Sequence, residues 1–459
     1  MLIDCPGAAR TLTQADMATG NIIMEEVTGR LNSFQRTMLQ WNGLHPYNAV
    51  HVMRVAGELD LARLQSVVGA VLESRGLTGF MIDRSRTSFS YQGGAAQGRI
   101  KLLNSRTDEL HQLIEEIEAQ LNQPFDPGAR SEPFRFVVAP DGNDAFRLVL
   151  VYFHPIADAE SIVWLMKDID AGYQNPAAIA AFKPLGRNPP RHDSLLLRRP
   201  GLLLRWLLAL PALIRSARSS FRPTVRDQAD LRNGFRFFTA ASGKLPQLLA
   251  TAKSWGVTLN DLFLAALLLA VAPLAKERRQ APRRRLISVA TIVNIRRDVG
   301  RGDQNTFGLA LGSFRVAHEV PEGLGLEPLA RAMQLQTKRA KQGKLFLATP
   351  LQLTFARFLF SRLTPDRQKK FYPKNQPLWA GITNLNLNAL WTNADGGAPP
   401  DYFRAVSTGP ATPLVFSITT AGDRLNVGIS FRSAVFLNSE VAHVQDALQS
   451  LLTNACRME

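Results

Sequence analysis

The sequence predicts a mixed α/β (α+β) protein of two lobes joined by a basic connector. Its 459 residues, 46% of them hydrophobic, are enough for about two to three domains with sizeable cores. Short β-branched and aromatic runs alternate with amphipathic helical segments on both sides of an Arg-, Leu- and Pro-rich stretch. We therefore expect a weakly ordered leader at 1–30, an N-terminal lobe at 31–175, a connector at 176–234 and a C-terminal lobe at 235–459.

The N-terminal lobe is predicted from apolar spacing and turn signals. Apolar residues recur at helical spacing in two segments before residue 75, and the turn Gly57-Glu58-Leu59-Asp60 precedes the second of them. Asp141-Gly142-Asn143-Asp144 is a turn signal between two extended runs and predicts a hairpin. The predicted elements are a helix at 31–39, a strand at 49–56, a helix from 61, a strand-rich piece at 80–103, a helix at 108–121 and a hairpin at 134–156.

The most informative stretch lies where the second hairpin strand ends. The run Leu148–Phe153 leads directly into His154-Pro155, and Asp158 precedes a predicted helix from Glu160. Catalytic groups concentrate in loops held between rigid elements, and an imidazole titrates near neutral pH, so His154 could act as a general base. A histidine at a strand end can equally be a core or capping residue. The residue pattern alone leaves both interpretations open.

The segment from Phe153 to Ala159, Phe-His-Pro-Ile-Ala-Asp-Ala, resembles the His-His-x-x-x-Asp-Gly signature of a CoA-dependent acyltransferase superfamily. That superfamily includes chloramphenicol acetyltransferase, condensation domains of nonribosomal peptide synthetases, polyketide-associated acyltransferases and wax ester synthases. The resemblance implies that His154 is the base, that Asp158 is structural, and that two chloramphenicol-acetyltransferase-like lobes enclose a central tunnel. Phe153 replaces the first His, and Ala159 replaces Gly with an extra methyl that could narrow the tunnel.

The C-terminal half carries further points of resemblance. Gly256-Val257-Thr258-Leu259-Asn260-Asp261 resembles the family's entry to a buried helix, here at 262–275. Asn294-Ile295-Arg296 resembles a context in which an Arg reaches the motif Asp, which implies an Arg296–Asp158 pair. The alternative is that Arg296 belongs to a basic turn. Asn384 lies in a stretch similar to the family's Ser-Asn-x-Gly strand, which implies a side-chain donor to the oxyanion. The alternative is a structural hydrogen bond.

Charge and missing motifs limit the classes of partner. The chain has 54 Lys and Arg against 38 Asp and Glu, a net charge of +16, which favours an anionic partner such as nucleic acid, an anionic membrane or a phosphorylated substrate. The sequence contains no nucleic-acid-binding module, Gly-rich phosphate loop, Gly-x-Ser-x-Gly elbow or His-Glu-x-x-His helix. We therefore expect no nucleic-acid partner, no metal site and direct transfer without a covalent enzyme intermediate.

Cysteine usage and hydropathy bear on location. Cys5 and Cys456 have no partner spacing, which favours a reducing, cytoplasmic compartment. The start of the chain lacks a signal-peptide pattern, and the apolar run at 262–275 is too short for a bilayer, so a buried helix is expected there. The connector's arginines punctuate Leu-rich stretches. Such a helix can lie in a membrane interface or pack on the protein with a solvated basic edge. Prolines at 189, 190, 200, 211 and 223 are expected to break any single long helix there.

The resemblance implies transfer of an acyl group from a thioester to a hydroxyl or amine acceptor. His154 would remove the acceptor's proton. The donor, an acyl-CoA or a phosphopantetheine-linked acyl group on a carrier protein, would be a co-substrate, with no permanently bound cofactor. Phe153 and Ala159 motivate a competing hypothesis, a catalytically degenerate protein that binds partners or docks carriers. The connector favours a lipophilic substrate and peripheral contact with an anionic membrane, as in lipid or secondary-metabolite biosynthesis.

Overall fold

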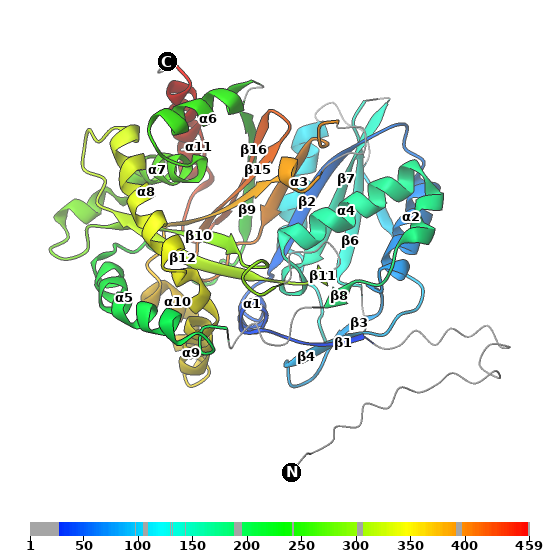
Figure 1. The fold of residues 1–459 in the computed structure, drawn as a ribbon, viewed down its shortest axis with the longest axis horizontal. Coiled ribbons are helices and arrows are strands. Elements are labelled where there is room, and N and C mark those ends of the chain that lie inside the picture. The colour runs from blue at the N-terminus through cyan, green and yellow to red at the C-terminus, as the bar shows by residue number, and fades with distance from the viewer. Residues whose placement is uncertain are drawn as a thin grey trace, which may run out of the picture.

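Two mixed α/β lobes lie side by side in the computed structural model, as the sequence predicts (Figure 1). The structure describes residues 27–457 except 97, 104–108, 129, 131, 143, 188–194, 241–242, 301–305 and 392–396. Each lobe has its own sheet and its own hydrophobic core. Two small sheets complete the strands: β1 (Val27–Arg30), β4 (Ser88–Tyr91) and β3 (Phe80–Ile82) form one, and β11 (Thr306–Phe307) with β8 (Gly186–Arg187) the other.

The N-terminal lobe is built on a five-stranded sheet whose centre is the predicted hairpin. In order across the sheet the strands are β14 (Tyr402–Val406), β2 (Asn48–Ala56), β7 (Ala145–Phe153), β6 (Phe134–Pro140) and β5 (Ile100–Leu102). The helices of this half are α1 (Ser33–Asn42), α2 (Leu61–Ser74), α3 (Glu109–Asn122) and α4 (Ala159–Gln174). The middle strand β7 is buried along nearly its whole length because both of its faces are covered. The hairpin therefore holds the end of β7 in a fixed place.

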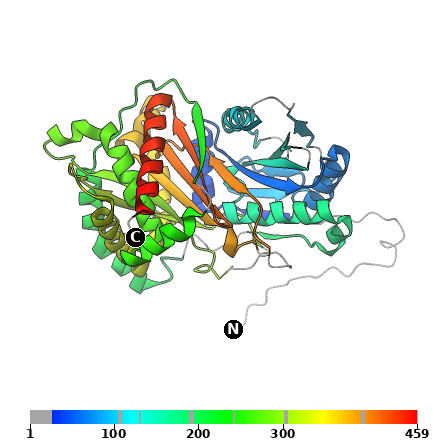
Figure 2. The ribbon, with the colours of Figure 1, turned by 90° about the horizontal axis from the view of Figure 1, so that it is seen from above.

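The C-terminal lobe is built on a six-stranded sheet. Its strands, in order, are β12 (Leu311–His318), β10 (Ile287–Asn294), β13 (Ala380–Asn386), β15 (Leu414–Ala421), β16 (Arg424–Arg432) and β9 (Asn233–Ala240). The helices of this half are α5 (Pro200–Ser219), α6 (Lys244–Ser254), α7 (Leu259–Val271), α8 (Leu326–Gln342), α9 (Thr349–Phe360), α10 (Pro365–Asn375) and α11 (Asn438–Ala455). Figure 2 shows α11 lying across one face of this sheet. The expected buried apolar helix is α7, which begins after Thr258 because Thr258 and Asp261 form a capping box.

One strand ties the lobes together. β14 comes from the C-terminal half of the sequence but pairs antiparallel with β2, so that Arg404 lies opposite His51. It also passes very close to β16, where a Cβ added to Gly428 would lie 2.1 Å from the Arg404 carbonyl oxygen. Only glycine permits that approach. The sheets therefore do not follow the predicted division of the chain at residue 235, because 235–459 supplies an edge strand to the N-terminal lobe.

Two local features differ from the predictions. Val27–Arg30, which the sequence assigns to the leader, form strand β1 and pair antiparallel with β4, from Val27 opposite Tyr91 to Arg30 opposite Ser88. Residues 1–26 lie outside the described residues. In the connector, α5 continues through Pro211 instead of breaking there. Pro211 is exposed, so water can hydrate the carbonyl that its missing N–H leaves unpaired.

Two helical stretches are long and apolar enough to cross a membrane by length and composition. In the one at Leu259–Gln280, 61% of the most apolar window is buried, as expected for a core helix. The other is α5, and none of its corresponding window is buried. α5 is therefore an apolar helix that lies on the surface of the protein.

Candidate active site

The turn that carries His154 is held by contacts from two other parts of the chain. β7 ends at Phe153, His154–Ile156 form one short 3-10 turn, and α4 begins at Ala159. The His154 N–H donates to the Tyr47 carbonyl at 3.2 Å, and Gln35 Nε2 of α1 donates to the Pro155 carbonyl at 2.9 Å. Because these partners are distant in sequence, the turn is fixed by the tertiary structure and not by its own residues.

The His154 ring has a defined orientation. It stacks on Tyr47 with ring centroids 5.3 Å apart and an interplanar angle of 16°, and it meets Tyr152 edge-on at 5.6 Å. Its Nδ1 lies 3.2 Å from the Ala157 carbonyl oxygen. A carbonyl oxygen can only accept, so this hydrogen bond puts the proton of the neutral ring on Nδ1 and leaves the lone pair on Nε2. Nε2 is then the atom that can take a proton.

Burial sets the charge state of this ring. Burial lowers the pKa of His154 from 6.5 to about 4, and the charge on Arg404 acts in the same direction, while the Ala157 hydrogen bond and Asp158 oppose it. The imidazole is therefore neutral at pH 7, the form that a general base requires. The residue remains 8% exposed. The ring is therefore largely removed from water but is still accessible from the protein exterior or a cavity.

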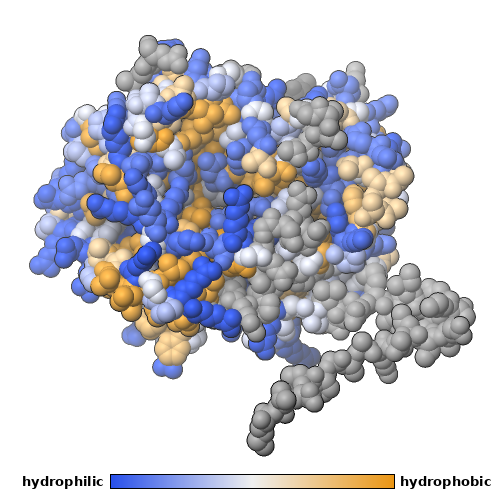
Figure 3. Space-filling view, viewed as in Figure 1, coloured by the Kyte–Doolittle hydropathy of each residue, from blue (hydrophilic) through white to orange (hydrophobic). Residues whose placement is uncertain are grey.

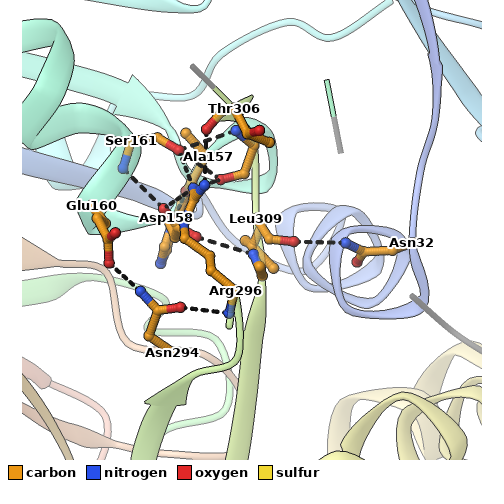
Figure 4. Close-up of polar contacts among 12 residues, drawn as sticks. Asn32, Ala157, Asp158, Glu160, Ser161, Asn294, Arg296, Thr306 and Leu309 are labelled. Atoms are coloured by element: carbon orange, nitrogen blue, oxygen red, sulfur yellow. Dashed lines mark hydrogen bonds and ion pairs between the residues drawn. The ribbon is translucent and has the colours of Figure 1, made fainter. Parts of the chain in front are cut away.

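Asp158 and Arg296 form the ion pair that the resemblance implies, as Figure 4 shows. Arg296 Nη2 lies 2.8 Å from Asp158 Oδ1, and both side chains are almost fully buried. Asp158 also caps α4 by accepting from the Ser161 N–H at 3.0 Å, and its other oxygen accepts from the Ala310 N–H at 3.0 Å. The pair therefore joins the His154 turn to the segment after β10. The basic-turn interpretation of Arg296 is wrong, because its guanidinium points inward.

A cavity of about 660 Å³ lies between the lobes, and His154 is part of its wall. Strands β2, β7, β10, β12, β13 and β14 contribute to the wall, together with helices α1, α5, α8 and α9. Ala159 also lines it. Phe153 does not, because its side chain is buried in the core beside Phe125, with ring centroids 5.9 Å apart. The phenylalanine that replaces the usual His therefore does not plug the cavity.

Asn384 does not join this site. It is exposed on β13, whereas its neighbour Thr383 lines the cavity. The cavity is lined by Gly381, Ile382 and Thr383, and the exposed Asn384 follows them on the strand outside this lining. The structure thus gives no support to Asn384 as an oxyanion donor. Among the described residues, no group of three or more His, Cys, Asp or Glu side chains could hold a metal ion.

The residue-by-residue interpretation missed a buried polar cluster beside His154. His51 Nδ1 lies 2.6 Å from Tyr402 Oη, and the His51 ring meets Tyr152 edge-on at 5.6 Å. Arg404 is 1% exposed and lies opposite His51 in the β14–β2 register. His51, Tyr152 and Arg404 all line the cavity. The sequence signal for them is weak, because β2 and β7 are mostly apolar but also contain Arg54 and Arg147.

No protein-family model and no curated protein matches this chain. Its similarity to solved structures is extensive. The first condensation domain of the calcium-dependent antibiotic synthetase, in complex with substrate analogue 3a, matches with a TM-score of 0.69 and 14% sequence identity over 94% of this chain and 97% of that one.

This is the condensation-domain fold. SgcC5 from Streptomyces globisporus matches with a TM-score of 0.64 and 14% identity over 94% of this chain and 99% of that one. The X-domain from teicoplanin biosynthesis matches with a TM-score of 0.59 and 14% identity over 93% of this chain and 95% of that one. The predicted fold is therefore confirmed over nearly the whole chain, and the function must be argued from the site itself.

Proposed function

We propose that the protein is an acyltransferase that moves an acyl group from a thioester to a hydroxyl or amine acceptor, with His154 as general base. The donor is an acyl-CoA or an acyl group on a carrier protein. The observation that carries the proposal is a neutral imidazole, oriented by Tyr47 and Ala157, in the wall of a cavity large enough for a small organic substrate.

The proposed reaction moves one proton in two transfers, from the acceptor to His154 and from His154 to the leaving group. The acceptor's O–H or N–H donates to His154 Nε2 while its heteroatom attacks the thioester carbonyl carbon. Collapse of the tetrahedral intermediate breaks the carbon–sulfur bond, and the proton on His154 passes to the leaving thiolate. Asp158 and Arg296 take no part in proton transfer and hold the turn in place. Because burial lowers the pKa of His154, the ring readily gives up the proton that it takes and returns to its neutral form in every cycle.

A second candidate function is a binding or carrier-docking protein without catalysis. Phe153 and Ala159 depart from the family signature, and the X-domain from teicoplanin biosynthesis, which shares this fold, has been solved as a complex with OxyB. The open wall at His154 favours the enzyme, because a purely structural histidine would need no access to a cavity.

The two candidates are separated by thiol release. The protein is incubated with a panel of acyl-CoA thioesters of increasing chain length, with and without hydroxyl and amine acceptors, and free CoA thiol is titrated. The acyltransferase predicts acceptor-dependent release above the uncatalysed rate. The binding protein predicts saturable thioester binding by calorimetry with no release above that rate.

We further propose that α5 and α9 contact an anionic membrane surface beside the cavity. Both helices contribute to the cavity wall, and neither contains Asp or Glu. Figure 3 shows hydrophobic side chains gathered over this region and interrupted by hydrophilic ones. Seven large hydrophobic side chains are exposed there, with Leu208 the most exposed at 73%. They are Leu204, Leu207, Leu208 and Ile214 on α5, and Phe355, Phe358 and Leu359 on α9.

Arginines flank these side chains on both helices, so the surface combines buriable apolar area with positive charge, as interfacial helices do. A lipophilic substrate could then enter the cavity directly from the bilayer. The test is sedimentation with vesicles of phosphatidylglycerol and of phosphatidylcholine. Wild type should sediment with the anionic vesicles, and Leu204→Asp with Leu208→Asp should abolish this, whereas Leu335→Asp on α8 should not. Equal sedimentation of all three would contradict the proposal.

A further inference from the structure

The cavity wall is positively charged. Among the residues that the structure describes, its lining includes three arginines, Arg315, Arg339 and Arg404, and no Asp or Glu. Arg315 and Arg339 lie at the part of the wall near α5 and α8, where Arg315 donates to the Leu213 carbonyl at 2.9 Å. Arg404 lies deeper, on the sheet that carries His154. A wall of this composition attracts an anionic group into the cavity.

Arg404 is a buried cation without a counterion among the described residues. Its Nε donates to Thr419 Oγ1 at 3.0 Å, and its Nη2 donates to the Ile418 carbonyl at 2.7 Å and the Thr383 carbonyl at 3.2 Å. No described residue accepts a hydrogen bond from Nη1. Burial lowers the pKa of Arg404 to about 10, so the guanidinium stays charged at neutral pH.

A second buried arginine shows what a purely structural role looks like in the same chain. Arg278 is 2% exposed, and its Nε, Nη1 and Nη2 donate to the carbonyls of Ala272, Ala275, Glu319 and Val320. These bonds use all the N–H groups of the guanidinium. Arg404 differs because it keeps its Nη1 N–H groups available and lines the cavity. The difference indicates a partner that arrives from the cavity.

We propose that Arg404 Nη1 binds a carboxylate of the molecule that reacts in the cavity, with the Tyr152 hydroxyl as a second donor. Tyr152 lines the same wall, and burial raises its pKa, so it remains protonated. A carboxylate carries one negative charge and matches one buried cation, whereas a phosphate monoester would bring nearly two. Charge-assisted hydrogen bonds of this kind are among the strong ones in proteins.

The register places Arg404 on the same sheet as His154, which puts the proposed carboxylate in the part of the cavity where the reaction occurs. Arg404 pairs with His51 of β2, and β2 pairs with β7, whose end delivers His154. Arg404 and His154 thus lie along one wall, two strands apart. The carboxylate belongs either to the acyl chain, as in a dicarboxylic monothioester, or to the acceptor, as in an amino or hydroxy acid. That either molecule is a substrate rests on the proposed function, but its binding can be measured without turnover.

The test is calorimetric binding of matched pairs to the full-length protein. The donor arm compares succinyl-CoA with butyryl-CoA and glutaryl-CoA with pentanoyl-CoA. The acceptor arm compares a panel of amino and hydroxy acids with their amides. In one arm the acid should bind about 10- to 100-fold more tightly than its uncharged match, the range expected for hydrogen bonds to a charged group. The arm that shows the preference identifies the carboxylate-bearing partner.

Variants then assign the preference to Arg404. Arg404→Gln should remove it, whereas Arg278→Gln, which also loses a buried guanidinium, should keep it. Equal binding of acids and uncharged matches by wild type in both arms would overturn the proposal, as would an unchanged preference in Arg404→Gln. If Arg404→Gln does not fold, the wild-type comparison still decides. Thiol release without a carboxylate preference would refute this inference alone, and a preference without thiol release would refute only the proposed catalysis.

Discussion

Loss of the Arg296 guanidinium should destabilise the protein far more than loss of a surface ion pair. Arg296→Met removes the 2.8 Å contact with Asp158 and the 2.8 Å hydrogen bond to the Thr306 carbonyl. Asp158 is 1% exposed, and the described donors that remain for its charge are the Ser161 and Ala310 N–H groups. Breaking a buried pair from one side costs about 3–5 kcal/mol, and the two remaining donors favour the lower end, about 3 kcal/mol.

The assay is urea unfolding followed by fluorescence, carried out as a double-mutant cycle. Asp158→Asn in the Arg296→Met background removes the stranded charge and should recover at least about 1 kcal/mol, because neighbouring groups couple by about that much. Arg331→Met is the matched control. Its pair with Glu327 on α8 is 2.7 Å long but exposed, so it should cost less than about 1 kcal/mol. A loss in Arg296→Met no larger than in the control would refute the reasoning.

Two further predictions concern the His154 environment and the contact between lobes. Because burial lowers the pKa of His154 to about 4 and the neutral ring is the base, kcat/KM should stay flat from neutral pH down to roughly pH 5.5 and fall below it. An inflection near 6.5 in the pH profile would mean that the ring is solvated. Gly428→Ala should lower the free energy of unfolding, measured by thermal unfolding, by about 1–3 kcal/mol, because the added Cβ would lie 2.1 Å from the Arg404 carbonyl oxygen. Gly69→Ala in α2, whose nearest neighbour lies at 3.8 Å, should cost nothing, and similar losses in both would contradict the close approach.

The predicted features that the structure confirms have strong local signals. The hairpin at 134–156 follows from two apolar runs around a turn, and the buried helix α7 follows from its capping residues and apolar length. The Arg296–Asp158 pair came from the resemblance, because nothing local relates residues 138 positions apart. A contact between the lobes could therefore be predicted only where its two residues match a family motif.

The remaining features depend on pairing between distant strands. β14 is a five-residue strand whose Tyr402 meets His51 across 351 positions, and no periodicity indicates that partner. The cluster of His51, Tyr152, Tyr402 and Arg404 was therefore missed. The position of Asn384 depends on how far the cavity extends along β13, which no local pattern indicates. The predicted helix break at Pro211 is wrong, because the residue is exposed and its exposure does not follow from the sequence.

The central claim is that the His154 imidazole takes the acceptor's proton. The most direct test measures kcat/KM for His154→Ala with the thioester and acceptor that give the fastest thiol release, alongside calorimetric binding of the same thioester. We expect kcat/KM to fall by about 10²- to 10⁴-fold with binding retained, and the exposed His443→Ala to behave as wild type. Turnover by His154→Ala at the wild-type rate would contradict the account.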